Sequence, residues 1–151
     1  MATERIKLGE RWTVELSQPT RERVEALAAE GFRSLVNLRT SEEVGQALSP
    51  DEEGAVARQH GLQYLHMPVS PSNLGTEAAR RFDEAVARLP APTLVHCASG
   101  RRAGLLTLTQ VARAEGLSGD DAVARAERLG IELNDQAKSI LRQYADGEGR
   151  R

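Results

Sequence analysis

The chain is poor in the features that mark nucleic-acid-binding, secreted and membrane proteins. Aromatic residues make up only 3% of it, so it offers no platform on which bases could stack. Its net charge of -2 argues against the basic surface that binding to a nucleic-acid backbone needs. A single cysteine cannot form an internal disulfide, and no apolar run is long enough for a signal peptide or a membrane span. These absences predict a cytoplasmic protein that binds neither nucleic acid nor membrane.

Length and composition predict one folded domain. A chain of 151 residues can bury a core, and a content of 40% hydrophobic and 28% charged residues is ordinary for a globular protein. Because aromatic residues are scarce, the core must be aliphatic. We expect a single domain over residues 1–151, with its core at about 10–145 and a flexible tail at 146–151.

Strand-like and helix-like patterns alternate along the chain. The clearest helix start combines Ser49 as N-cap, Pro50 at the first helical position and Glu52 as the partner in a capping box. Gly31 is expected to end an earlier helix. Strands are expected at 12–16, 32–38, 62–69 and 93–96, and helices at 21–31, 49–61, 76–89, from within or just after 100–104, 118–130 and 134–145. The alternation predicts an α/β fold, a three-layer domain with a central, mainly parallel sheet of four to five strands flanked by helices.

The only cysteine lies in the stretch TLVHCASGRRAG, where a strand meets a small, glycine-containing turn. In parallel sheets, ligands bind at the carboxyl ends of the strands, which is where Cys97 is expected. A helix N-terminus and nearby arginines favour the thiolate form of a cysteine. Ala98, Ser99 and Gly100 are small enough for backbone N–H groups to surround an anion, and Arg102 adds a planar fork of donors. The pattern predicts a nucleophilic thiolate at the base of an anion-binding loop.

A structural interpretation of the same stretch competes with this one. A lone cysteine at the end of a buried strand often acts as a small hydrophobe, and Gly-Arg-Arg-Ala suits a plain turn with solvated arginines. The joint occurrence of strand, cysteine, small residues, glycine, arginine and helix start favours the catalytic interpretation.

The string HCASGRR resembles the cysteine loop of protein tyrosine and dual-specificity phosphatases and of rhodanese-type sulfurtransferases. A wider set of segments resembles the β-lactamase-hydrolase-like phosphatases, bacterial domains with a dual-specificity-phosphatase fold. These segments are LSQPTRERVEALAAEGFRSLVNLR, GLQYLHMPVSPSNL and PTLVHCASGRRAG, in this order, over about residues 10–116. The resemblance implies hydrolysis of a phosphomonoester through a thiophosphate on Cys97, with Arg102 clamping the phosphoryl group and with no metal or other cofactor.

The resemblance also assigns roles to the neighbours of the cysteine. His96 would orient the loop by hydrogen bonding. The implied phosphate-binding positions are Ala98, Ser99, Gly100, Arg101 and Ala103. The implied partner is a phosphorylated small molecule or protein, and neither the natural substrate nor the oligomeric state follows from the sequence.

Two departures from the phosphatase pattern leave alternatives open. Tyrosine and dual-specificity phosphatases usually have five residues between cysteine and arginine, whereas Cys97 and Arg102 enclose four, the spacing of rhodanese-like loops. Arg101 is an alternative clamp, and Ala103 lacks the hydroxyl that commonly follows the arginine. The segment PVSPSNLGT also has no carboxylate before Glu77 to protonate a leaving group. Slow phosphatase turnover is expected, or sulfur transfer from a sulfane sulfur donor, or an inactive anion-binding module.

Other polar residues receive structural interpretations. His60 closes a helix and His66 packs on a strand face, so neither suits a metal site. Arg39 ends a strand at the same edge as Cys97. It is expected to pair with Glu42 or Glu43, or to attract an anionic substrate. The single tryptophan is expected to anchor the core or an edge of the sheet.

Overall fold

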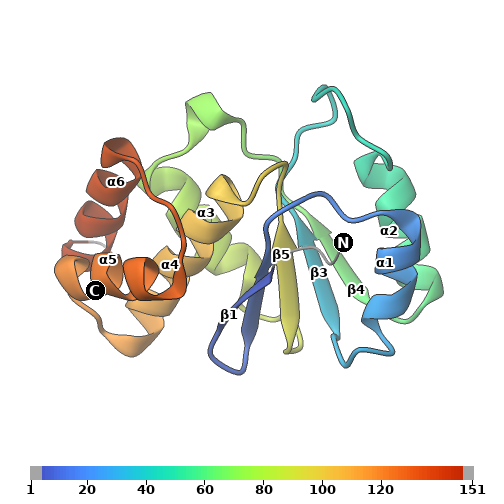
Figure 1. Ribbon diagram of the computed structural model, residues 1–151, viewed down its shortest axis with the longest axis horizontal. Helices are drawn as coiled ribbons and strands as arrows, with labels where there is room; N and C mark the ends of the chain where they lie inside the picture. The colour runs from blue at the N-terminus through green and yellow to red at the C-terminus, as the bar shows by residue number, and fades with distance from the viewer. Residues whose placement is uncertain (1–4, 148–151) are drawn as a thin grey trace.

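The computed structural model describes residues 5–147, which form three layers with a five-stranded sheet between two groups of helices (Figure 1). The strands are β1 (Arg5–Leu8), β2 (Trp12–Glu15), β3 (Ser34–Asn37), β4 (Gln63–His66) and β5 (Thr93–His96), in the order β1-β2-β5-β3-β4. The helices are α1 (Arg21–Leu27), α2 (Pro50–Gln59), the 3-10 turn η1 (Pro71–Asn73), α3 (Thr76–Val86), α4 (Arg101–Glu115), α5 (Gly119–Leu129) and α6 (Asp135–Asp146). This is the predicted three-layer α/β fold.

The sheet is parallel apart from one edge strand that the sequence analysis did not predict. β2, β5, β3 and β4 run parallel, with Val14 and Val36 both opposite Val95. β1 pairs antiparallel with β2 and places Leu8 opposite Trp12. Like the other strands it has four residues, its sequence RIKL alternates polar and apolar side chains, and its pairing with β2 holds it at the edge.

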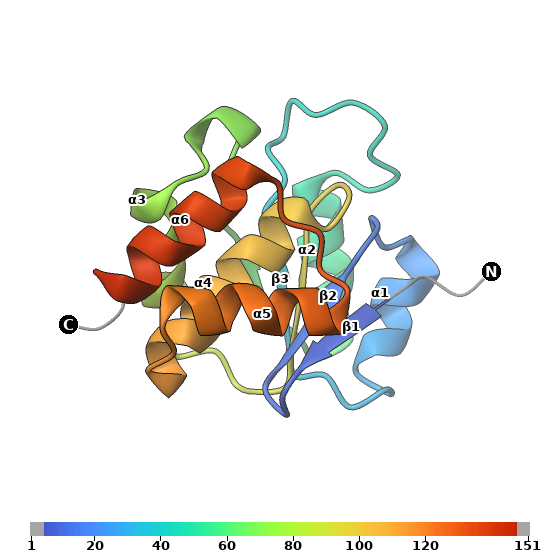
Figure 2. The ribbon, with the colours of Figure 1, turned by 60° about the vertical axis from the view of Figure 1, so that its left-hand side comes forward.

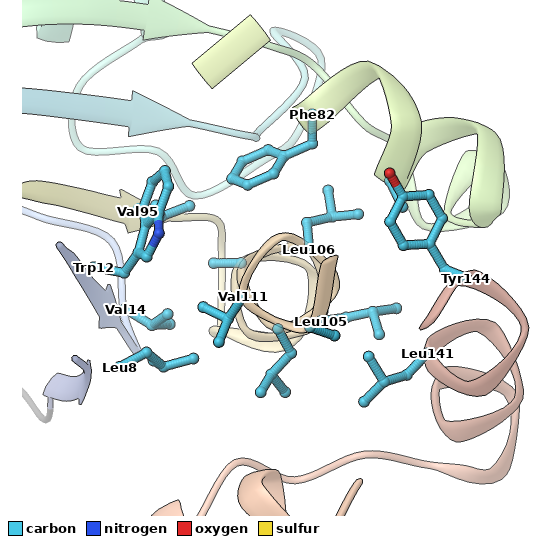
Figure 3. Close-up of a cluster of buried hydrophobic side chains, with 14 of the residues drawn as sticks. Leu8, Trp12, Val14, Phe82, Val95, Leu105, Leu106, Val111, Leu141 and Tyr144 are labelled. Carbon is cyan, nitrogen blue, oxygen red and sulfur yellow. The ribbon is translucent and has the colours of Figure 1, made fainter. Parts of the chain in front are cut away.

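Alternating side chains of the central strands supply a core on each face of the sheet. Leu35 and Leu94 point to the face covered by α1 and α2, whereas Val36 and Val95 point to the face covered by α3–α6. On the second face α4 runs through the centre of the cluster, between the sheet and α6 (Figure 3). Trp12, 3% exposed, belongs to this cluster, as its predicted role as an anchor requires.

Local sequence signals located several helix ends correctly. The capping box is present, with Ser49 accepting from the Glu52 N–H and the Glu52 side chain accepting from the Ser49 N–H. α1 is shorter than expected and ends at Leu27, so that Gly31, with φ 101°, lies in the turn after it. The predicted flexible tail lies largely outside the described residues, and Asp146 is still helical.

The loops that follow the parallel strands meet at one end of the sheet. Figure 2 shows the loop after β3, η1, the loop after β5 and the beginning of α6 together at this end. Parallel strands bring their carboxyl ends to one edge, so residues distant in sequence become neighbours there. Among residues 5–147 no helix is both long enough and apolar enough to cross a membrane.

Candidate active site

Cys97 lies between the end of β5 and the first turn of α4, as the sequence predicts. Its side chain is buried, with 1% of the residue exposed. The Gly100 N–H donates to the Cys97 Sγ at 3.2 Å and the Ala103 N–H at 3.5 Å. These are N–H groups at a helix N-terminus, which have no carbonyl partner within the helix and favour negative charge. The sulfur therefore lies where backbone donors would stabilise a thiolate.

Gly100 is required by the path of the loop. Its φ of 95° lies in the left-handed region, which residues with a side chain rarely adopt. A Cβ atom at this position would lie 2.6 Å from the Leu16 Cδ2 and 3.1 Å from its Cα. The glycine therefore lets the loop curl around the sulfur while it packs closely against the chain that leaves β2.

The Arg102 side chain turns into the protein and is held along one edge. Its Nη1 donates to the Glu43 Oε2 at 2.7 Å and to the Val69 carbonyl at 2.8 Å, and its Nη2 donates to the Glu43 Oε1 at 2.9 Å. Of the five guanidinium N–H groups, Nε–H and one Nη2–H remain without a carboxylate or carbonyl acceptor in the described part of the chain. Hydrogen bonding to Glu43 and the nearby Cys97 raise the pKa of Arg102 above its usual value.

Glu43 is a site residue that the sequence analysis assigned elsewhere. The hydrogen bonds from Arg102, together with the Thr40 N–H at 2.6 Å, lower the pKa of this carboxyl group to about 2. Glu43 is therefore ionised at neutral pH and acts as an acceptor rather than a proton donor. The expected Arg39–Glu43 pair is wrong because Glu43 bonds to Arg102 instead, 59 residues away in the chain.

Arg39 belongs to a buried cluster beneath the cysteine loop. Its Nη2 donates to the Glu53 Oε1 at 2.9 Å, its Nε to the Asn37 Oδ1 at 3.1 Å and its Nη1 to the Gln18 Oε1 at 2.6 Å. Because its side chain is 1% exposed, Arg39 does not face an incoming substrate. The capping box starts α2 such that Glu53, in its first turn, points inward to meet this guanidinium.

His96 links this cluster to the cysteine loop. Its Nε2 lies 2.6 Å from the Glu53 Oε2, and its Nδ1 lies 3.2 Å from the Cys97 carbonyl oxygen. The imidazole is fully buried, so its orientation is determined by these two contacts. The arrangement suits a loop-orienting residue, and that role stays a prediction.

A pocket of about 640 Å³ opens beside the loop. Of the predicted phosphate-binding residues, Ala98, Ser99 and Arg101 line it, as does the predicted clamp Arg102. Gly100 and Ala103 are buried. The Arg101 side chain is exposed, so the inward-turned arginine is Arg102. The rest of the wall consists of Glu43, Pro71, Leu74, Glu132, Leu133, Asn134, Gln136, Ala137 and Ile140.

The wall from 132 to 140 has no counterpart in the sequence analysis. It comes from the connection between α5 and α6 and from α6 itself, which follow the cysteine motif by about 30 residues in the sequence. Helical periodicity could locate α6 but could not indicate which face turns toward a pocket. The carboxylates that line the pocket are Glu43 and Glu132, and the segment 67–75 contributes none. Residues 5–147 also contain no cluster of histidine, cysteine and acidic side chains that could hold a metal ion.

Comparison with known proteins agrees with the geometry. A profile of the family described as "Beta-lactamase hydrolase-like protein, phosphatase-like domain" matches residues 14–114. A β-lactamase hydrolase-like protein of Xylella fastidiosa is 29% identical over 138 residues, covering 91% of this chain and 32% of that protein. The chain thus spans about a third of the length of this relative.

Solved structures share the fold. A candidate phosphatase from Neisseria meningitidis superposes with a TM-score of 0.75 at 24% identity, covering 92% of this chain and 96% of the other. Tk-PTP in its active form superposes with a TM-score of 0.73 at 20% identity, covering 96% and 98% of the two chains. Since the family profile spans β2 to α4 and includes the cysteine loop, the chain belongs to the phosphatase-like domains of the β-lactamase hydrolase-like proteins.

Proposed function

We propose that the chain is a cysteine-dependent phosphatase that hydrolyses a phosphomonoester in two steps. The observation that carries the proposal is the position of the Cys97 sulfur, which accepts two N–H groups at the start of α4 beside the inward-held Arg102. Family membership and the shared fold support it.

In the first step the Cys97 thiolate attacks phosphorus. An S–P bond forms as the ester P–O bond breaks, and the departing oxygen takes up a proton from solvent or leaves as the anion. The backbone N–H groups and the two remaining N–H groups of Arg102 stabilise the charge on the phosphoryl oxygens. In the second step water attacks phosphorus, the S–P bond breaks, and inorganic phosphate leaves as the thiolate is restored.

The leaving group determines how fast such an enzyme works. Glu43 is ionised and hydrogen-bonded to Arg102, so it cannot donate a proton to the leaving group. The segment after β4 contains no carboxylate that could serve as the general acid. General acid catalysis contributes about 10²–10⁴-fold to reactions with poor leaving groups. We therefore expect measurable turnover of activated aryl phosphates and slow turnover of alkyl phosphates.

Sulfur transfer is the second candidate, favoured by the short spacing between Cys97 and Arg102. In that reaction the thiolate attacks the sulfane sulfur of thiosulfate, the S–S bond breaks, sulfite leaves and a persulfide remains on Cys97. A thiol acceptor then removes the outer sulfur. Like the phosphatase reaction, this chemistry needs a thiolate beside an anion site, but it needs no general acid.

Replacement of the nucleophile tests both candidates. The wild type and Cys97→Ser are assayed with 4-nitrophenyl phosphate, and each is incubated with thiosulfate before its intact mass is measured. We expect phosphate release by the wild type and a loss of at least about 10³-fold in the variant, because hydroxyl is a much poorer nucleophile than thiolate here. Thermal unfolding of both proteins serves as the control for folding.

The remaining outcomes separate the candidates. Phosphatase activity that survives in Cys97→Ser contradicts the covalent mechanism. Gain of one sulfur atom by the wild type alone, released by cyanide as thiocyanate, without phosphate turnover, replaces the phosphatase with a sulfurtransferase. Binding of inorganic phosphate without either reaction reduces the site to an anion-binding module.

A further inference from the structure

Away from the cysteine loop, the pocket is lined by five apolar residues together with four polar ones, which are Glu43, Glu132, Asn134 and Gln136. Ala137 and Ile140 lie three residues apart on α6, a spacing that places side chains on one face of a helix, and Leu133 lines the pocket from the segment just before α6. Leu74 and Pro71 face the pocket from the segment before α3. Any group attached to a phosphoryl group at the loop would extend along this lining.

The charges in the pocket are sufficient for one phosphoryl group. Glu43 already neutralises one edge of Arg102, whose other edge stays available for phosphoryl oxygens. Besides Glu43 and Arg102, the charged side chains of the lining are Arg101, in the loop itself, and Glu132. A second phosphoryl group would therefore meet a single cation and a carboxylate. The four charged lining residues carry no net positive charge, unlike a site built for polyanions.

On the basis of the proposed function, we propose that the site selects monophosphate esters with an uncharged, apolar alcohol portion. The wall at Leu133 receives that portion, and Glu132 disfavours esters that carry a second phosphoryl group. Apolar walls gain affinity by removing apolar surface from water, and a carboxylate repels a second anion across a short distance.

Binding measurements test this selectivity without turnover, so that leaving-group chemistry does not enter. The probes are methylphosphonate, benzylphosphonate, inorganic phosphate and inositol hexakisphosphate, titrated calorimetrically at low salt. For the wild type we expect benzylphosphonate to bind at least about 10-fold more tightly than methylphosphonate, as burial of a ring in an apolar pocket implies. Inositol hexakisphosphate is expected to bind no more tightly than inorganic phosphate.

Two variants address the two parts of the site. Leu133→Ser is expected to remove most of the preference for benzylphosphonate and to leave inorganic phosphate binding within about 2-fold. Glu132→Lys is expected to tighten binding of inositol hexakisphosphate by about 10-fold, an effect that added salt weakens. The matched controls are Leu89→Ser and Glu10→Lys. Both residues line a second hollow at the opposite end of the sheet, so these substitutions should change none of the affinities.

The outcomes distinguish this proposal from the proposed function. Equal affinities for the two phosphonates, or unchanged affinities in Leu133→Ser, overturn the selectivity even if the enzyme hydrolyses phosphate esters. Tight binding of inositol hexakisphosphate by the wild type overturns it as well. Selective binding of benzylphosphonate without phosphatase activity supports the proposed selectivity of the pocket and contradicts the proposed function.

Discussion

Two charged clusters lie on either side of the cysteine loop, and they differ mainly in burial. Below the loop, the side chains of Arg39, Glu53 and His96 are at most 1% exposed. Beside the pocket, the Arg102 and Glu43 side chains are 8% and 22% exposed. In both clusters an arginine meets a glutamate at less than 3 Å.

The difference in burial predicts different roles for the two clusters, support of the loop for the first and ligand binding for the second. The groups of the first cluster are buried away from solvent, so an incoming ligand does not meet them, and we expect them to hold the position of the loop. At the pocket, Arg102 donates from Nη1 and Nη2 to Glu43. Its remaining N–H groups lie on the other edge of the guanidinium, and the residue lines the pocket. Removal of one partner from a buried pair leaves a charge in a medium that solvates it poorly, whereas water partly compensates at an exposed pair.

The largest effect on stability is expected from Glu53→Gln. This change removes the carboxylate that Arg39 and His96 share and leaves the arginine buried without its counter-charge. We expect the free energy of unfolding to fall by about 3–5 kcal/mol, measured by urea denaturation at neutral pH. The control, Glu77→Gln, breaks an exposed pair with Arg80 and should cost less than about 1 kcal/mol. Equal losses in the two variants would show that burial does not set the cost of losing a carboxylate partner.

A smaller effect, dependent on pH, is expected from Glu43→Gln. At neutral pH the loss of its charge-assisted hydrogen bonds to Arg102 should lower the free energy of unfolding by about 2 kcal/mol. Its pKa is lowered from 4.5 to about 2 in the folded protein, so its contribution is fully present above pH 4.5 and is lost as the pH falls toward 2. The difference from the wild type should therefore shrink between pH 6 and pH 3.

The matched control for this variant is Glu42→Gln, because Glu42 is the exposed neighbour in the same loop. It should leave stability within about 0.5 kcal/mol of the wild type across the same pH range. A pH-independent loss in Glu43→Gln would assign the effect to packing rather than to charge.

The smallest effect is expected from Arg101→Ala. Its side chain is exposed at the start of α4, so truncation should change the free energy of unfolding by no more than about 0.5 kcal/mol. Calorimetric titration should show binding of inorganic phosphate weakened by less than about 3-fold, because an exposed cation contributes little in water. A loss as large as that of Arg102→Ala would identify Arg101 as the clamp.

Local signals made the fold and the position of the cysteine predictable. β5 occupies the predicted residues, the capping box at Ser49 is formed, and Cys97 lies at the strand end where a helix begins. Each of these features depends on residues a few positions apart. β1 was missed although its sequence RIKL alternates polar and apolar residues, because one such short stretch does not by itself distinguish an edge strand from a loop, and pairing with β2 completes the strand.

The partners of the charged side chains could not be predicted in the same way. Glu43 is 59 residues from Arg102, and Glu53 is 43 residues from His96. The sequence showed the carboxylates near Arg39 but not the direction in which each would turn. The apolar lining from Ala137 and Ile140 likewise depends on how α6 packs against α4.

By itself the sequence determined the alternation of strands and helices, the start of α2 and the placement of the one thiol at a strand end, because hydrophobic periodicity and helix capping act between near neighbours. Only the tertiary structure decided that Arg102 donates hydrogen bonds to Glu43 and that Glu53 is buried against Arg39 and His96. It also decided which side chains line the pocket. Those contacts arise where several strands end at one edge of the sheet, and burial there determines which of the available charges pair.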